Sequence, residues 1–397
     1  MPRQLVDWID AYVKYQENTE PPRMFHLWCA INIIASVLQR KCRLEWGTIT
    51  FYPNMYVVLV APSGKARKGT AMSPALNFLE DLNIKLAAEA ITREALIREL
   101  NSASDTDHDL ETGNMEFHSS LTIFSPELTV FLGYNNEQLM SDLTDWYDCR
   151  NKWTYRTKTQ GTDEIRGVYV NLIGATTPEL IAETMSRKAI GGGLTSRMIF
   201  VYEEDKGKIV PRPFLTDAQR GLYQQLKDDL NDIHFMRGRF DITEDFIRYW
   251  EDWYVKQEHN PPFNDIKFGG YIERRPNHVM KLSMILSASR SDRMLLEFQD
   301  IERAVRILEA TEVNMQRTFA GVGKYTHADT LAQVMNEIAI RGDSGITHEE
   351  LSYIFRNDAN VQILREIIDS LNVSGFLDSI TRDGKEIYVR KGEGGDA

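Results

Sequence analysis

The stretch that most constrains the fold is residues 51–72, FYPNMYVVLVAPSGKARKGTAM. Its first half, Met55 to Ala61, is a continuous valine-rich apolar run, which is typical of a strand buried on both faces of a parallel sheet. A loop of small and basic residues follows, and Ser73 to Leu79 then has the character of a helix. Strand, small-residue loop with lysine and hydroxyl, and helix together form the layout of a phosphate-binding loop. The stretch therefore predicts an α/β fold with a phosphate site after a central strand.

The loop departs from the usual phosphate-loop consensus in two glycines and in its hydroxyl, because Gly69 stands directly after Lys68 where the pattern has serine or threonine. With Lys68 as the phosphate lysine, the pattern G-x-x-x-x-G-K-[ST] expects glycine where this chain has Pro62 and Arg67. Thr70 is expected to offer its hydroxyl to Mg²⁺, and which of Lys65 and Lys68 reaches the phosphates stays open. An alternative interpretation is an ordinary strand, turn and helix with surface lysines. The residues expected to contact the nucleotide are Ser63, Gly64, Lys65, Lys68, Gly69 and Thr70.

Composition and charge restrict the classes of function. A chain of 397 residues, 42% hydrophobic and 26% charged, is long enough for several globular domains. Its three cysteines lack paired spacing, which predicts a reducing compartment and neither a disulfide framework nor a zinc site. The apolar run Leu27 to Leu38 is too short to span a membrane, and no signal peptide precedes it, so we expect a cytoplasmic protein. A net charge of −12 means that any nucleic-acid contact must be local.

Two further apolar strands end in residues that suit phosphate chemistry. A strand over 120–124 is followed by Ser125-Pro126-Glu127, and a glutamate at such a strand end can orient an attacking water. A strand over 168–174 leads to Thr176 and Thr177, and either hydroxyl can sense the γ-phosphate or that water. We therefore expect Glu127 and Thr177 to be catalytic. The alternatives are a helix N-terminal acid that interacts with the helix dipole, and a turn threonine before proline.

A basic segment lies between these two strands. Between Asp148 and Asp163 the chain carries several cations and no acid, although the whole protein is acidic. Aromatic residues and threonines alternate with the cations, and Gln160-Gly161-Thr162 supplies a turn, so the segment predicts a β-hairpin. Cations with aromatic rings suit contact with a nucleic-acid backbone and its bases, whereas the alternative is an exposed hairpin kept soluble by charge. The residues expected to contact nucleic acid are Arg150, Lys152, Trp153, Tyr155, Arg156 and Lys158.

An arginine follows a glycine-rich turn later in the same region. Three glycines at 191–193 lead to Arg197, and an apolar strand over 198–202 comes directly after it. An arginine in this position is a candidate arginine finger, which stabilises phosphate charge at the nucleotide of a neighbouring subunit. The alternative is a loop arginine that pairs with the acidic residues 203–205.

The rest of the chain suggests four segments. Residues 1–50 are expected to form a helical collar, 51–212 the core with the phosphate loop, and 213–325 a helical lid or bundle. Residues 326–397 have the pattern of three helices and a two-stranded wing, a winged-helix domain whose contact with DNA or with protein stays open. Residues 101–117 are polar, acidic and without periodicity, so we expect a mobile surface loop there.

Helix starts and wing residues can be predicted more closely. In the lid segment, helices are expected over 216–233, with Thr216 as the N-cap, and from Arg274-Arg275-Pro276 onward. In the last segment, Thr347 is the expected N-cap of the second helix, and 387–389 is the second strand of the wing.

Taken together, these motifs resemble a known family. YPNMYVVLVAPSG with Lys68, then SPE, Tyr147-Asp148, VNLIGATTPE and GGGLTSR, are similar to a phage and prophage family of P-loop proteins with RecA-like cores and largely unknown function. More distantly, the order of phosphate loop, acidic strand end, basic hairpin, sensor strand and L-T-S-R resembles the hexameric helicases of superfamily 3 and of the minichromosome-maintenance type. The resemblance covers about residues 20–320.

The resemblance implies a specific architecture and a role for each site residue. The implied fold is α/β: a RecA-like or AAA-like P-loop ATPase core with an N-terminal helical collar, a helical lid and a C-terminal winged helix. In this family the loop binds phosphate, a glutamate ends the acidic strand, a polar residue ends the sensor strand, and an arginine acts as the finger. The residues that fall on these positions are Lys68 and Thr70, Glu127, Thr177 and Arg197, with 150–158 on the DNA-contacting hairpin.

The implied function is an ATP-dependent, ring-forming DNA helicase or translocase in bacteriophage DNA replication, with ATP and Mg²⁺ as cofactors. The expected partners are single-stranded or forked DNA, other copies of the chain in a hexameric ring and replication proteins, in the host cytoplasm. Pro126 stands where the related ATPases have a metal-binding aspartate, which favours an ATP-assembled initiator or helicase loader without motor activity. A third alternative is a small-molecule phosphotransferase, because nucleoside monophosphate kinases also carry the sequence K-G-T.

Overall fold

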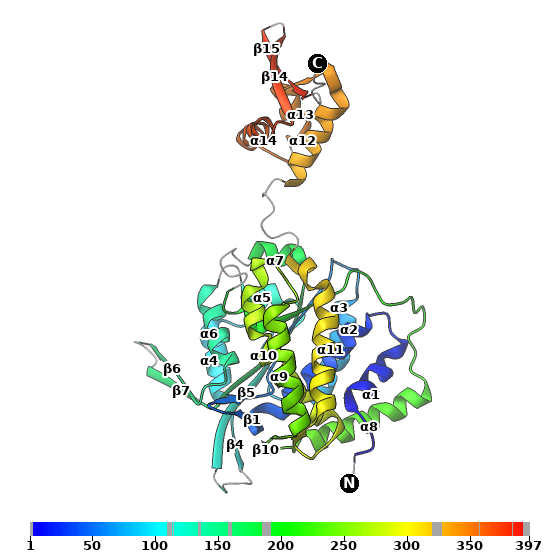
Figure 1. Ribbon diagram of the computed structural model, residues 1–397, viewed down its shortest axis with the longest axis vertical. Helices are drawn as coiled ribbons and strands as arrows, with labels where there is room; N and C mark the ends of the chain where they lie inside the picture. Colours follow the sequence, from blue (N-terminus) through cyan, green and yellow to red (C-terminus); the bar gives the residue numbers. More distant parts are fainter. Residues whose placement is uncertain are drawn as a thin grey trace. The chain divides into compact units, whose positions relative to one another are not determined.

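The computed structural model divides into two compact units, residues 1–322 and 323–397, which are described separately (Figure 1). The first unit is a mixed α/β structure built on a mostly parallel sheet, which bears out the predicted α/β class. The predicted collar, core and helical lid all lie within this unit up to residue 322. The structure describes residues 3–108, 113, 115–133, 136–157, 161–184, 192–319, 328–356, 358–382 and 384–391.

A five-stranded sheet forms the centre of the first unit. Its strands are β3 Tyr56–Val60, β4 Ser104–His108, β5 Met115–Ser125, β8 Val168–Thr176 and β9 Met198–Tyr202. They lie in the order β4-β5-β8-β3-β9, with β3 parallel to both β8 and β9, and β8 parallel to β5. Every residue of β3 is buried, as expected for a strand covered on both faces, so the predicted central strand is confirmed.

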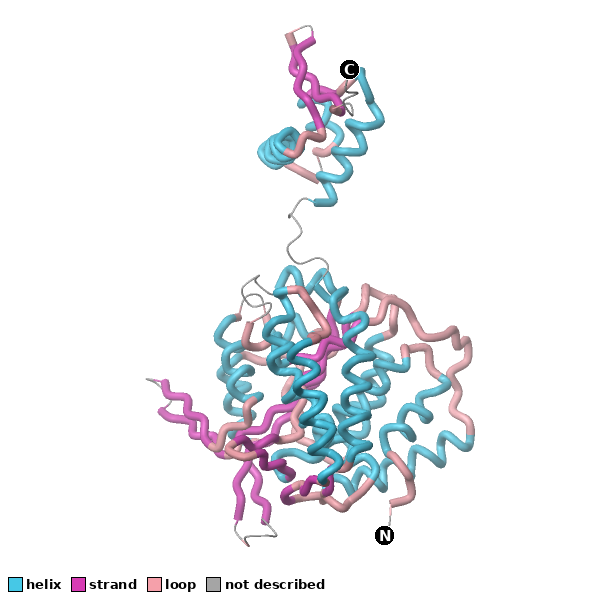
Figure 2. Tube along the Cα trace, in the orientation of Figure 1, coloured by secondary structure: helices cyan, strands magenta, loops and turns pink. Residues whose placement is uncertain are grey.

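Helices cover this sheet, as the tube view shows with helices in cyan and strands in magenta (Figure 2). Smaller β-ladders and one projecting hairpin complete the unit. The helices are α1 Trp8–Tyr15, α2 Arg23–Leu38, α3 Lys68–Asp81, α4 Arg93–Ser102, α5 Leu128–Leu132, α6 Glu137–Tyr147, α7 Pro178–Thr184, α8 Asp217–His234, α9 Glu244–His259, α10 Gly269–Arg290 and α11 Phe298–Met315. The remaining strands are β1 Cys42–Trp46, β2 Ile49–Phe51, β6 Lys152–Thr157, β7 Gly161–Arg166, β10 Gly238–Arg239, β11 Asp241–Ile242 and β12 Leu295–Leu296.

Buried asparagines fix α2 on the sheet. The side-chain amide of Asn32 donates to the carbonyl of Leu172 at 2.9 Å, and Asn171 donates to the Asn32 side-chain oxygen at 2.9 Å. The oxygen of Asn171 in turn accepts the backbone N–H of Met55 at 2.8 Å. A buried amide without partners is costly, so this network favours one register among α2, β8 and the start of β3.

Part of the predicted helical collar is wrong, because Cys42–Trp46 and Ile49–Phe51 form β1 and β2. Two further expectations about this unit are wrong. Part of the predicted 101–117 loop is ordered, because Ser104–His108 forms β4 and pairs antiparallel with the first residues of β5. This edge strand lacks hydrophobic alternation because most of its side chains are exposed and only its backbone is paired. The second of these is the start of α10: the helix begins at Gly269, so Arg274 to Pro276 lie inside it.

The second unit has a hydrophobic core of its own. It contains α12 Ala328–Arg341, β13 Ile346–Thr347, α13 His348–Ile354, α14 Val361–Val373, β14 Leu377–Arg382 and β15 Lys385–Arg390. Its strands lie in the order β13-β15-β14, and Thr347 caps α13 in a reciprocal capping box with Glu350. The unit contains the expected three helices and an antiparallel pair of strands, and sequence reasoning missed the short strand β13.

The hairpin base gives a stability prediction. Gly167 joins β7 to β8 with a φ of +56°, and a Cβ there would collide with the carbonyl oxygen of Phe117. Gly47 has nearly the same φ, +61°, but has nothing within 4 Å of its ideal Cβ position. We expect Gly47→Ala to lower the free energy of unfolding by about 1 kcal/mol and Gly167→Ala by roughly 3 kcal/mol or more. Chemical denaturation measures both losses, and equal losses would show that the hairpin base is not tightly packed.

Candidate functional site

The loop between β3 and α3 lies at the carboxyl edge of the parallel strands. Lys68 is the first residue of α3, is half-buried, and donates its Nζ to the carbonyl of Ala61 at 2.7 Å. The first N–H groups of a helix have no partner within the helix, and the helix dipole is positive at that end. The loop and helix start therefore form an anion-binding geometry around Lys68.

Arg67 stands where the phosphate-loop consensus has glycine, and its backbone adopts the left-handed conformation that glycine favours. Its φ of +57° and ψ of +42° lie in the left-handed region, which costs a residue with a side chain roughly 1–2 kcal/mol. The Arg67 side chain pairs with Glu20 at 3.0 Å, and Glu20 also binds Lys206 at 2.7 Å. These ion pairs join the loop to the segment before α2 and to the segment after β9.

Two carboxylates act on Lys68 from neighbouring strand ends. Burial lowers the pKa of Lys68, whereas the negative charges of Glu127 and Glu179 act to raise it. Glu127 follows the end of β5 and is exposed, while Glu179 lies in the first turn of α7 after β8. Thr177 lies between β8 and α7, and its hydroxyl accepts the N–H of Leu180 at 3.3 Å. The structure thus brings Lys68, Glu127 and Thr177 to one edge of the sheet.

The remaining predicted loop residues differ in orientation. Lys65 is 55% exposed and its Nζ lies 3.3 Å from a carboxylate oxygen of Asp205, which follows β9. Gly64 has a φ of +72°, which suits a tight turn. Lys68 is therefore the lysine at the start of the helix. Ser63, Gly64, Gly69 and Thr70 are exposed along the loop and the first turn of α3.

The Thr176 hydroxyl is a polar group at the same edge without a protein partner. Thr176 is 1% exposed, ends β8 beside Val60 of β3, and has no hydrogen-bond partner for its Oγ1 among the described residues. A buried hydroxyl without a partner loses hydration without compensation. Sequence reasoning weighed Thr176 beside Thr177, and of the two it is Thr176 whose hydroxyl has no partner within the described part of the chain.

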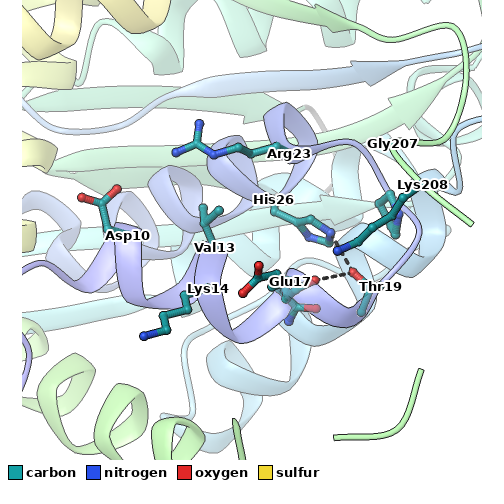
Figure 3. Close-up of a pocket in the computed structure, with 11 residues that line it drawn as sticks. Asp10, Val13, Lys14, Glu17, Thr19, Arg23, His26, Gly207 and Lys208 are labelled. Atoms are coloured by element: carbon teal, nitrogen blue, oxygen red, sulfur yellow. Dashed lines mark hydrogen bonds between the residues drawn. The ribbon is translucent and has the colours of Figure 1, made fainter. Parts of the chain in front are cut away.

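A cavity of about 530 Å³ lies beside the segment that carries Glu20 (Figure 3). Residues of α1, of the start of α2 and of the segment after β9 line it, and Figure 3 shows His26, Thr19 and Lys208 close together. Burial, with a smaller effect of Lys208, lowers the pKa of His26 to about 4, so its ring is neutral at pH 7. His26 Nδ1 and Gln16 Nε2 are buried without hydrogen-bond partners among the described residues. Sequence reasoning missed this cavity, because its polar residues look like ordinary members of helical segments.

Arg197 lies at the opposite, amino edge of the sheet. It precedes β9, whose first residue Met198 pairs with Tyr56 at the start of β3. Its side chain is buried, donating to Asp148 at 2.7 Å and to the carbonyl of Gly193 at 2.8 Å. The alternative pairing with residues 203–205 is therefore wrong. The structure does not bring Arg197 together with Lys68 in the same chain.

The basic segment forms the predicted hairpin, β6 paired with β7, which projects from the body of the unit (Figure 1). Lys152 and Arg156 are exposed on one face, where Lys152 pairs with Glu164 at 2.6 Å. Trp153 and Tyr155 lie on the other face, half-buried. Trp153 packs on Trp146 with ring centroids 5.4 Å apart, and Arg93 covers the Tyr155 ring at 4.8 Å.

Two of the predicted hairpin residues need separate mention. Arg150 lies just before β6 and pairs with Asp145 at 3.1 Å. Lys158 lies outside the described residues.

Comparison with protein-family models and with curated protein sequences finds no match to this chain. Among the described residues, no three His, Cys, Asp or Glu side chains gather as potential metal ligands. No helix in the described part of the chain has the length and apolar character needed to cross a bilayer.

Proposed function

We propose that the chain is a P-loop ATPase with a RecA-like or AAA-like core that assembles into a ring and moves along DNA. The observation that carries the proposal is the loop after β3, where Lys68 starts α3 beside Glu127. The left-handed Arg67 adds support, since it adopts a backbone conformation natural to the glycine of the consensus. A surface lysine on an ordinary turn would need neither feature.

The strand order supports the same proposal. In RecA-like P-loop ATPases, the class that the sequence resembles, an extra strand lies between the loop strand and the acidic strand. Here β8 lies between β3, which precedes the loop, and β5, which leads to Glu127. All three strands are parallel, so their carboxyl ends meet at one edge.

Each residue has a proposed part in hydrolysis. Lys68 neutralises charge on the terminal phosphates and the helix start binds them through backbone N–H groups. Glu127 orients the attacking water, and Thr176 or Thr177 donates a hydroxyl hydrogen bond to that water or to the γ-phosphate. Mg²⁺, which prefers octahedral oxygen ligands and keeps several waters, fits the exposed hydroxyl of Thr70 beside the phosphates and would neutralise charge there.

Arg197 can serve a nucleotide only in another copy of the chain. It lies at the amino edge of the sheet, whereas Lys68 lies at the carboxyl edge. A head-to-tail ring would bring the two edges of neighbouring subunits together, which supports assembly as part of the mechanism. The proposed ring is a hexamer in the host cytoplasm.

DNA contact is proposed for the exposed face of the hairpin. Lys152, Arg156 and Arg166 lie on that face with Glu164 between them, so a net positive charge faces solvent. In the second unit, which we propose to be a winged helix, α14 carries a single cation, Arg365, against Glu366 and Asp369. That composition favours protein contact over duplex DNA there.

One observation favours a second function. Pro126 stands where a metal-binding aspartate is expected, so the chain lacks one ligand of a robust hydrolytic site. A protein that uses ATP only to assemble on DNA, as an initiator or loader, would bind nucleotide and form the ring without turnover. Steady-state hydrolysis separates the two functions.

The first prediction from the proposed function concerns the two loop lysines. Lys68→Ala should weaken ATP binding about 10- to 100-fold, because a half-buried charge at the helix start is lost. Lys65→Ala is the matched control in the same loop and should change binding less than about threefold, since an exposed ion pair contributes little. Equilibrium binding of a fluorescent ATP analogue measures both. An equal loss in the two variants would contradict the assignment of Lys68.

The second prediction concerns the cavity beside Glu20, which we propose holds the nucleoside. Gln16→Ala should weaken ATP binding about tenfold, because the amide that pairs with the base is removed, and leave the affinity for inorganic triphosphate unchanged. Glu17→Gln, a change at an exposed residue that also lines the cavity, is the control. A loss of triphosphate affinity in Gln16→Ala would instead indicate a general disruption of the loop.

The third prediction concerns the hairpin. Arg156→Ala should abolish most of the stimulation of ATP hydrolysis by single-stranded DNA and flatten its salt dependence, because one phosphate contact is lost per subunit. Arg248→Ala removes an arginine on α9 whose side chain is 74% exposed, and it should leave stimulation intact. Hydrolysis that is absent in wild type, while ATP is bound, would reject the motor and favour the assembly-only function.

A further inference from the structure

The guanidinium of Arg197 is buried but incompletely paired. Of its five N–H donors, one on Nη2 goes to Asp148 and one on Nη1 goes to the carbonyl of Gly193. Its Nε is buried without a hydrogen-bond partner among the described residues. Such a group gains hydrogen bonds if it moves to a phosphate, which offers several acceptor oxygens.

Arg275 shows what a fixed buried arginine looks like in the same unit. Its Nε and Nη2 both donate to the carboxylate of Glu312, at 2.7 and 2.9 Å, and both side chains are 4% exposed. This bidentate pair uses both oxygens of the acid and holds the guanidinium plane in place. The single contact of Arg197 with Asp148 is looser, and the Asp148 side chain is 38% exposed.

Asp148 serves a second arginine as well. The Nη1 of Arg274, on α10, lies 3.4 Å from the other oxygen of the same carboxylate. Burial, followed by the charge of Arg197, lowers the pKa of Arg274, so the two guanidiniums repel each other. If Arg197 leaves, Asp148 keeps a positive partner and Arg274 loses a repulsive neighbour. Departure of Arg197 therefore leaves no carboxylate unpaired.

The first strand of the hairpin, β6, begins four residues after Asp148. The carbonyls of Arg150 and Asn151 accept the N–H groups of Val168 and Gly167, which joins the bases of its two strands. Arg40 donates to the carbonyl of Cys149 at 3.0 Å and to the side chain of Asn151 at 2.6 Å. A short, hydrogen-bonded stretch of chain, residues 149–151, therefore joins Asp148 to the base of the hairpin.

We propose that Asp148 is a positioning residue that latches Arg197 inside its own subunit and releases it when nucleic acid loads the hairpin, with Arg274 retaining the carboxylate. The proposal rests on the proposed role of Arg197 at the nucleotide of a neighbouring subunit. It couples the DNA face of one copy to the active site of the next through a single exchange of ion-pair partners.

The direct test measures the accessibility of Arg197 in the full-length protein. Phenylglyoxal modification of arginines, mapped by mass spectrometry, should modify Arg197 about tenfold faster in Asp148→Asn than in wild type, because the charged partner is lost. Asp145→Asn is the matched control, since Asp145 is also 38% exposed and pairs with Arg150, and it should leave Arg197 protected. Arg275 should stay protected in both variants, which reports an intact fold. Equal protection of Arg197 in the two variants overturns the latch.

Two further experiments test the release of Arg197 from Asp148. Single-stranded DNA should raise the modification of Arg197 in wild type and should fail to do so in Arg274→Gln, where Asp148 has no replacement partner. No effect of DNA on wild type overturns the coupling. In Asp148→Asn, hydrolysis without DNA should rise about tenfold and lose its stimulation, a small part of the ~1,000-fold or more attributed to an arginine finger.

The hydrolysis arm separates this inference from the proposed motor. If Asp148 only held Arg197 in a catalytic position, Asp148→Asn would lower turnover both with and without DNA, which overturns the latch. DNA-dependent exposure of Arg197 in a wild-type protein that does not hydrolyse ATP would support the latch and reject the motor.

Discussion

Parallel pairing of β3 with strands on both sides is the constraint on which the candidate site depends. It brings the carboxyl ends of β3, β5 and β8 to one edge, where Lys68, Glu127 and Thr177 meet. The same pairing sends the start of β9 to the other edge. With about 3.3 Å per strand residue, the five residues of β3 separate the two edges by roughly 16 Å. No single side chain spans that distance, so a site that needs both edges needs two copies of the chain.

Buried polar groups hold this arrangement, and they differ in how firmly they do so. The amides of Asn32 and Asn171 satisfy each other and the backbone, which opposes any slip of α2 along the sheet. Arg275 and Glu312 form a closed bidentate pair whose disruption would leave a buried charge. The pair of Arg197 with Asp148 has neither the reciprocal hydrogen bonds of the two asparagines nor the bidentate contact of Arg275 with Glu312. Rigid networks around one exchangeable contact are what a switch between two discrete positions requires.

The sequence predicted the features that local pattern determines. A short valine-rich run is typical of a buried strand, and the caps at Thr216 and Thr347 follow from side-chain hydrogen bonding within one turn. Prediction from the sequence failed where backbone pairing or contacts between residues far apart in the chain determine the structure. The polar and acidic sequence of β4 does not predict a strand, because a mostly exposed edge strand needs no apolar face. The partner of Arg197 is 49 residues away in the chain, and only the fold identifies it.

The hairpin shows how structure changes the meaning of a correctly predicted element. The sequence suggested that cations and aromatic rings would contact nucleic acid together, as in proteins that stack bases. The pairing register separates them, because neighbouring residues of a strand point to opposite faces. Trp153 and Tyr155 therefore pack against the protein and brace the hairpin, which leaves Lys152, Arg156 and Arg166 for the solvent face. In the proposed function, a hairpin with charge outside and rings inside would follow a phosphate backbone of any sequence, and its hydrogen-bonded base would pass that contact to Asp148.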